Sequence, residues 1–295
     1  MTLGEEFHAQ GGEKTGPLIT SFLHVIDQIP AGNELGDVLQ LINPIQIYRR
    51  SCAEKYIPLL PPSLSTHPLT RRHRALDTQI ASLVRSRQQS AKLNEGKVLD
   101  YRTVLDLALQ DEEYGSQATL TELVDQMKTF LFAGHDTSAS MLSWAYYYLS
   151  THPTCLAALQ SEHNNVFGTN TNPDELALQI KTNPSILGKL EYTLAVLKES
   201  LRLRPIGDGV RYASSGYVVR TATGAQFDVT GTILNAQHLG LHTREEIWGG
   251  MGEEFDPERF MDGKSVPLGY MPFATRPRDC IGRNLAYLEV LLLWL

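Results

Sequence analysis

A cysteine near the end of the chain is the residue best placed for chemistry. Cys280 lies in a short segment that also holds Pro272, Pro277 and Gly282, and the apolar run LAYLEVLLLWL follows it closely. Proline and glycine disfavour regular structure, so we expect the thiol to lie on a loop just before a helix. The unpaired N–H groups of a helix N-terminus lower the pKa of a nearby thiol. Two interpretations follow: a thiolate that reacts or binds a metal, or a small buried apolar residue.

A second group of polar residues interrupts the longest apolar pattern in the chain. Residues 120 to 149 carry apolar side chains at helical spacing, and Gly134, Asp136 and Thr137 stand in the middle. A glycine inside a helix costs roughly 1 kcal/mol relative to alanine. We therefore expect a local opening of the helix with a polar pocket that holds water. The alternative is a tolerated glycine beside two side chains that face solvent.

A glutamate and an arginine lie one turn apart on a further predicted helix. Glu199 and Arg202 belong to the sequence KESLRLRP, within a helix expected over residues 187 to 203. This spacing places both side chains on one face, where they can pair. An exposed pair of this kind would contribute only a few tenths of a kcal/mol and would have no functional meaning.

The cysteine segment resembles the haem-binding loop of the cytochrome P-450 family, F-x-x-G-x-R-x-C-x-G. Phe273, Arg278, Cys280 and Gly282 stand at the matching positions, whereas Arg276 stands where the family has glycine. The resemblance implies that Cys280 is the thiolate ligand of the iron in haem b. It further implies that the matching phenylalanine, arginine and glycine help to bind the cofactor.

Three further parts of the sequence resemble motifs of the same family. The sequence AGHDTS, residues 133 to 138, resembles the motif that the family carries over the distal haem face. There Asp136 and Thr137 would organise the waters that deliver protons to bound dioxygen. The family's E-x-x-R pair is buried and tied to an arginine of a later loop, which corresponds to Arg259 in PERF. Arg211 matches an arginine that pairs with a haem propionate in many relatives.

The glycine missing from the cysteine loop raises a separate expectation. Glycine at the position of Arg276 indicates a positive φ or a close approach to neighbouring atoms. A non-glycine residue in such a conformation costs on the order of 1–3 kcal/mol. Our hypothesis is that Arg276 leaves the haem loosely held or absent.

The rest of the sequence predicts a mainly α fold with a minor antiparallel β-sheet. Thr119 and Glu122 predict a capping box at the start of the long helix. Alternating side chains around Gly224 and Gly231 predict hairpins of a small sheet. Further helices are expected over residues 17 to 29, 35 to 57, 68 to 93 and 154 to 167, and over the apolar run after Cys280.

Composition excludes several classes of protein. The 295 residues carry a net charge of −7, with 42% hydrophobic and 20% charged residues, as expected for a soluble globular chain. The mild acidity argues against a nucleic-acid partner. Cys52, Cys155 and Cys280 are odd in number and far apart, so no disulfide framework is expected. His238 and His242 are four apart in HLGLH, which lacks the glutamate and third ligand of a zinc site.

The resemblance implies one partial haem-thiolate domain over residues 1 to 295, truncated at both ends relative to eukaryotic microsomal, fungal-like members. It implies a monooxygenase that inserts one oxygen atom from dioxygen into a small apolar organic substrate, with electrons from an NADPH-dependent reductase. Full-length relatives are expected in the endoplasmic reticulum membrane, whereas the chain as written contains no anchor and is expected to be soluble. The alternative, suggested by the truncation and by Arg276, is a non-catalytic remnant with weak or no haem binding. The substrate itself is not predictable from these motifs.

Overall fold

The computed structural model describes most of the chain from residue 68 onward, in the ranges 68–93, 103–111, 114–169, 172–250, 252–261, 263, 266–275 and 277–294. The helices expected over residues 17 to 29 and 35 to 57 lie outside these described residues, and so does Arg276. The chain divides into two compact units, Met1–Ala133 and Gly134–Leu295. The long helix α7 (Leu120–Thr151) contributes its first part to one unit and its second part to the other.

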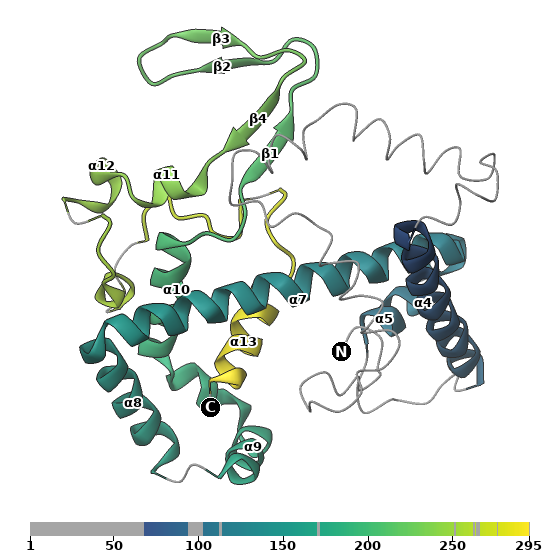
Figure 1. Ribbon diagram of the computed structural model, residues 1–295, viewed down its shortest axis with the longest axis horizontal. Helices are drawn as coiled ribbons and strands as arrows, with labels where there is room; N and C mark the ends of the chain where they lie inside the picture. Colours follow the sequence, from purple (N-terminus) through teal and green to yellow (C-terminus); the bar gives the residue numbers. More distant parts are fainter. Residues whose placement is uncertain are drawn as a thin grey trace. The chain divides into compact units, whose positions relative to one another are not determined.

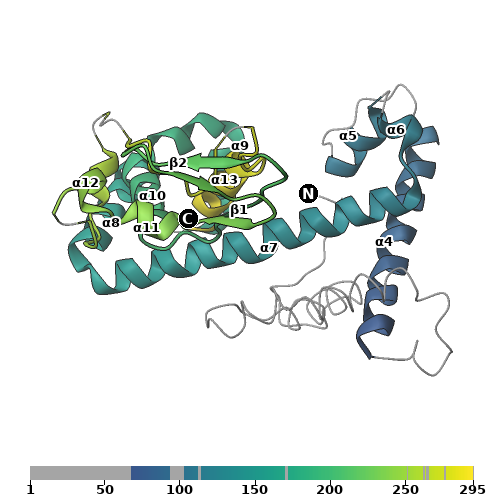
Figure 2. The same cartoon turned by 90° about the horizontal axis from the view of Figure 1, so that it is seen from above.

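The first unit is built from α4 (Pro68–Leu93), α5 (Val104–Gln110), the short α6 (Tyr114–Gln117) and the start of α7. Figure 2 shows α4 crossing the start of α7, with α5 and α6 close to it. Apolar side chains at helical spacing on α4 and α7 pack around α5, because burying these stripes removes them from water. The buried residues are Leu76, Ile80, Val84, Leu105, Leu123, Val124 and Met127.

The second unit is helical at its core. It contains the rest of α7, α8 (Pro153–Phe167), α9 (Pro173–Thr182), the 3-10 turn η2 (Pro184–Lys189), α10 (Glu191–Leu203) and α13 (Arg283–Leu293). Figure 1 shows α13 and α10 beside the second half of α7. Met141 and Ala145 of α7, Leu197 and Leu201 of α10 and Val290 of α13 form one buried cluster. This cluster fixes α13, and with it the segment that precedes α13.

Two antiparallel strand pairs lie between α10 and α13 in sequence. β1 (Gly209–Tyr212) pairs with β4 (Ile233–Ala236), and β2 (Val218–Arg220) pairs with β3 (Gln226–Asp228). Gly224, at φ +87°, lies in the turn of the β2–β3 hairpin, as its sequence predicted. Gly231, at φ +73°, precedes β4, and β4 pairs with β1, so the β2–β3 hairpin is enclosed by the β1–β4 pair rather than followed by a second hairpin.

Three short helical segments complete the fold: α11 (His238–His242), α12 (Glu245–Trp248) and the 3-10 turn η3 (Pro257–Phe260). The predicted helix over residues 68 to 93 and the predicted capping box of Thr119 with Glu122 are confirmed. The helix expected from residue 187 starts at Glu191, because η2 precedes it. The fold class, mainly α with minor antiparallel sheets, is confirmed. Within the ranges given above, none of the helices has the length and apolar character needed to cross a bilayer.

Candidate functional site

Cys280 lies on an exposed loop immediately before α13. Its N–H donates to the carbonyl of Phe273 at 2.9 Å, which closes the loop. A tight turn opens the loop: the N–H of Ala274 donates to the carbonyl of Met271 at 3.0 Å, and Ala274 has φ +59°. A Cβ added to Gly282 would lie 3.8 Å from the Cys280 sulfur. The thiol faces solvent, so the interpretation of Cys280 as a buried apolar residue is wrong.

Aromatic and charged contacts fasten the loop to α13. The Phe273 ring meets the Tyr287 ring edge to face, with centroids 5.1 Å apart. The Arg283 guanidinium lies 5.9 Å from the centre of the Phe273 ring and donates to the Asp279 carboxylate at 3.2 Å. Arg278 is exposed, and its backbone N–H donates to the Thr275 carbonyl at 3.2 Å. The predicted cofactor-binding residues Phe273, Arg278 and Gly282 therefore share one loop with Cys280.

Glu199 and Arg202 form a completely buried ion pair. Two parallel hydrogen bonds of 2.7 Å join the Arg202 guanidinium to the Glu199 carboxylate. Arg202 also donates to the carbonyls of His242 at 2.7 Å, Gly252, and Glu254 at 2.9 Å. Its charge is therefore surrounded by acceptors, as a buried guanidinium requires. The interpretation of this pair as an exposed surface contact is wrong.

The predicted third member of this network is present. The Arg259 Nε lies 3.6 Å from Glu199 Oε1, and its Nη1 donates to the Trp248 carbonyl at 3.1 Å. The backbone N–H of Asp256 donates to the same carboxylate at 2.9 Å. The network joins α10 to α12 and η3. It therefore holds α10 together with α12 and η3, the helical segments that precede the cysteine loop in sequence.

Sequence reasoning missed the role of His242. This side chain is completely buried, and its two ring nitrogens contact the Arg202 carbonyl and the Met271 N–H, each at 3.0 Å. Its neighbour His238 is 3% exposed and stacks on it with ring centroids 6.0 Å apart. Because both nitrogens of His242 are occupied, this residue has no atom left to ligate a metal. No group of three or more His, Cys, Asp or Glu side chains that could hold a metal ion occurs in the described part of the chain.

Asp136 and Thr137 lie on the exposed side of α7. The helix is continuous from Leu120 to Thr151, so the predicted local opening is wrong. The space beside Gly134 is open, since an added Cβ would meet no atom within 4 Å. The adjacent Ser138 is buried and donates to Glu289 of α13 at 3.0 Å. This bond ties the polar segment of α7 to the helix that follows Cys280.

Arg211 lies apart from these residues on β1. It is exposed, and its guanidinium donates to the carbonyl of the preceding Val210 at 2.8 Å. No contact joins Arg211 to the described residues of the cysteine loop, and its expected role at a propionate stays a prediction.

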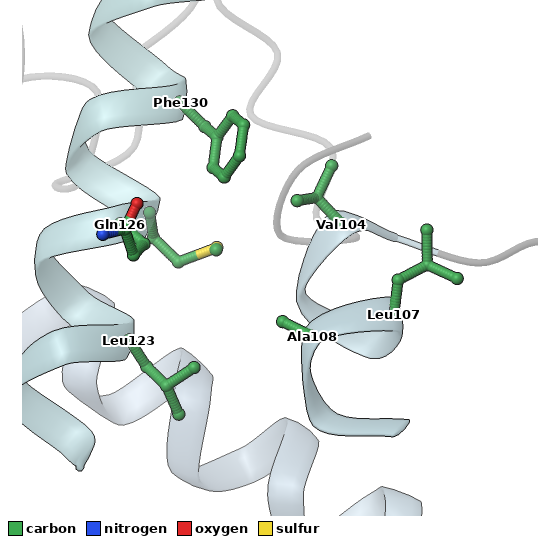
Figure 3. A pocket seen from close by; sticks show the side chains of 7 residues that line it. Val104, Leu107, Ala108, Leu123, Gln126 and Phe130 are labelled. Carbon is green, nitrogen blue, oxygen red and sulfur yellow. The ribbon is translucent and has the colours of Figure 1, made fainter. Parts of the chain in front are cut away.

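An open apolar cavity of about 440 Å³ lies in the first unit, between α5 and α7 (Figure 3). Gln126 is the one polar residue in its lining, which is otherwise formed by Val104, Leu107, Ala108, Leu123, Met127 and Phe130. None of the described residues in this lining is titratable or nucleophilic.

The cysteine loop suits haem better than a free metal ion. A porphyrin supplies the equatorial ligands of its iron, and the protein needs to add one axial ligand such as a thiolate. Cys280 is exposed and isolated from other metal-binding side chains of the described residues, and it lies just before α13. The donor set therefore fits this cofactor.

Known proteins match the chain over most of its length. The family model described as cytochrome P-450 matches residues 34–294. The cytochrome P-450 monooxygenase acrF of Aspergillus aculeatus is 30% identical over 320 residues, which cover 98% of this chain and 57% of that protein. A putative cytochrome P-450 of Caenorhabditis elegans is 40% identical over 178 residues, 59% of this chain and 32% of that protein.

A third relative is described as a self-sufficient cytochrome P-450 monooxygenase, from Exserohilum turcicum. It is 32% identical over 186 residues, which cover 62% of this chain and 16% of that protein. The matches thus cover 57%, 32% and 16% of the lengths of these three curated relatives.

Proposed function

Because this chain belongs to the cytochrome P-450 family, we propose that residues 1 to 295 form one partial haem-thiolate domain of a monooxygenase. The reaction inserts one oxygen atom from dioxygen into a small apolar organic substrate. The observation that carries the proposal is the position of Cys280, an exposed thiol on a closed loop directly before α13. The family match and the buried network of Glu199 and Arg202 support it further.

Cys280 would hold the iron of haem b through its thiolate, and Phe273, Arg278 and Gly282 belong to the same loop. When bound, the haem supplies the redox chemistry that activates dioxygen. Arg211 would pair with a propionate, for which the planar guanidinium is well suited. The carbonyl of Phe273 accepts from the backbone N–H of Cys280, while the Cys280 side chain is exposed.

Asp136 and Thr137 would move protons to the site of the reaction when the cofactor is bound. A hydroxyl donates and accepts at once, so Thr137 Oγ1 passes a proton from one ordered water to the next. The carboxylate of Asp136 is exposed and replenishes that proton from solvent. Ser138, which donates to Glu289, fixes this turn of α7 against α13.

Electrons come from NADPH through a reductase. The relative from Exserohilum turcicum is described as self-sufficient, so a separate reductase is one of two arrangements in the family. For full-length relatives we propose a location in the endoplasmic reticulum membrane.

Oxygen incorporation tests this function. The purified chain is supplied with haem, a reductase, NADPH, isotopically labelled dioxygen and a panel of small apolar compounds. We expect one labelled oxygen atom in a product, detected by mass spectrometry. Haem binding without any labelled product would contradict the monooxygenase assignment. A chain that binds no haem would be the non-catalytic remnant instead.

The proton relay gives a second test in the same assay. Thr137→Ala is expected to slow the proton-transfer step by roughly 100-fold and to divert electrons to peroxide, while haem still binds. Ser143→Ala is the matched control, because the Ser143 hydroxyl donates to Ala139 of its own helix. An unchanged ratio of product to NADPH in Thr137→Ala would remove Thr137 from the relay.

A further inference from the structure

His242 connects two parts of the molecule that are far apart in sequence. The side chain is completely buried, and each ring nitrogen contacts a backbone group at 3.0 Å. The carbonyl of Arg202 can only accept, so Nδ1 carries the proton and donates to it. The N–H of Met271 can only donate, so Nε2 is bare and accepts from it. The two contacts together fix the ring as the neutral Nδ1–H tautomer.

The contact between His242 and Arg202 is reciprocal. The Arg202 guanidinium donates to the His242 carbonyl at 2.7 Å, while the His242 ring contacts the Arg202 carbonyl. Arg202 is itself held by its two bonds to Glu199. His242 is therefore held to Arg202 of the buried ion pair through both its ring and its backbone carbonyl.

The other contact of His242 leads to the cysteine loop. Met271, whose N–H meets the ring, accepts from Ala274 in the turn that opens the loop. The loop that begins at this turn is closed by the hydrogen bond from the Cys280 N–H to the Phe273 carbonyl. The neighbouring Tyr270 adds a second anchor, because its hydroxyl donates to the Lys198 carbonyl of α10 at 2.9 Å.

We propose that His242 is a positioning residue for Cys280, which holds the first turn of the cysteine loop at a fixed place relative to the buried pair of Glu199 and Arg202. The inference rests on the proposed function for one point, the role of Cys280 as the haem ligand. The connection between His242 and the loop stands on the contacts of this structure alone.

Two substitutions separate the two contacts of the ring. The amide of asparagine is the same number of bonds from Cα as Nδ1, so His242→Asn keeps a donor for the Arg202 carbonyl and loses the acceptor for Met271. The amide oxygen of glutamine corresponds in the same way to Nε2, so His242→Gln keeps the acceptor for Met271 and loses the donor. His238→Gln is the matched control, because it removes the stacked neighbour and leaves both contacts intact.

Amide hydrogen exchange, resolved by peptide, measures the effect without haem. In His242→Asn we expect exchange over residues 271 to 280 to be about fivefold faster than in the unmodified chain, since one buried hydrogen bond is lost. His242→Gln and His238→Gln are expected to leave that peptide unchanged, even where they lower the melting temperature. If either His242 variant fails to fold, Tyr270→Phe removes the adjacent anchor and is expected to accelerate exchange in the same peptide.

The haem-loaded protein gives an independent signature. The fraction of the thiolate-ligated form, read from the reduced carbon monoxide complex, is expected to fall in His242→Asn and to persist in His242→Gln. Equal exchange over residues 271 to 280 in the two variants, or a larger increase in His242→Gln, would overturn the proposal and leave His242 a core residue. A chain that binds no haem would contradict the proposed function, whereas the exchange measurement would still decide the role of His242.

Discussion

At the scale of single residues, the Glu199–Arg202 ion pair is completely buried and therefore costly to disturb. Glu199→Gln leaves the completely buried charge of Arg202 without its anion. We expect a loss of roughly 3–5 kcal/mol in the free energy of unfolding, measured with denaturant. Arg244→Ala is the control, because the Arg244–Glu246 pair is exposed and its loss is expected to cost less than about 1 kcal/mol. Similar losses in both variants would show that burial does not govern the cost.

His242 makes the stability depend on pH. Burial lowers its pKa from 6.5 to about 4, and the nearby His238 and Arg202 act in the same direction, while the hydrogen bond with the Arg202 carbonyl opposes them. Glu199 and Tyr270 also face this site. The unfolded chain binds a proton at His242 below pH 6.5 and the folded chain does not until about pH 4. The contribution of neutral His242 to the free energy of unfolding is therefore complete above pH 6.5 and is lost as the pH falls towards 4.

The expected loss over this interval is on the order of 3 kcal/mol in the free energy of unfolding. Denaturant titrations between pH 7 and pH 4 measure it. The pH dependence is expected to be shallower in His242→Gln, which has no titratable group at that position. The same slope in both proteins would assign the pH dependence to other residues.

The sequence predicted the chemically distinctive residues and missed those defined by backbone contacts. Cys280, Glu199 and Arg202 stand in motifs of fixed spacing, and their loop and helix positions are confirmed. The sequence indicated His242 only as a candidate ligand, because its real partners are backbone atoms 40 and 29 residues away along the chain. No local pattern reports on such contacts.

At the scale of elements, α10 depends on a cap supplied by another helix. Leu190 precedes α10 and offers no capping side chain. Glu162 of α8 takes this role, because its carboxylate accepts from the N–H of Tyr192 at 2.6 Å and from the N–H of Thr193 at 2.8 Å. The Thr193 hydroxyl donates to the same carboxylate at 2.6 Å. A negative charge also suits the N-terminus of a helix.

Removal of this cap should be measurable. Glu162→Ala is expected to lower the free energy of unfolding by roughly 1–2 kcal/mol, because two N–H groups of α10 lose their acceptor. Glu191→Ala is the control, since this exposed acid of the same first turn acts only through the helix dipole and is worth a few tenths of a kcal/mol. Equal effects would mean that charge alone, and not the cap, stabilises the start of α10.

Long periodic elements were predictable and short ones were not. The bounds of α4 and the start of α7 follow from apolar spacing and from the capping box. The opening expected at Gly134 is absent, because a glycine with open space beside it can remain helical. The unpredicted α9 has a readable signal: Asn172 caps it, and Pro173 and Asp174 follow in its first turn.

At the scale of the whole molecule, family membership and fold class agree with the sequence, while the proposed activity depends on the cysteine loop. The family model matches residues 34–294, and the elements around Cys280 are held by contacts that span α7, α10 and α13. The exposed thiol of Cys280 is the feature on which the proposed haem binding and oxygen chemistry depend.

The reduced, carbon monoxide-bound absorption spectrum of the haem-supplied chain tests this claim most directly. We predict the red-shifted Soret band of a thiolate-ligated haem in the unmodified chain and in Cys155→Ala, whose substitution leaves the loop untouched. The band should be absent in Cys280→Ala. Persistence of the band in Cys280→Ala, or its absence from the unmodified chain, would contradict the assignment of Cys280 as the haem ligand.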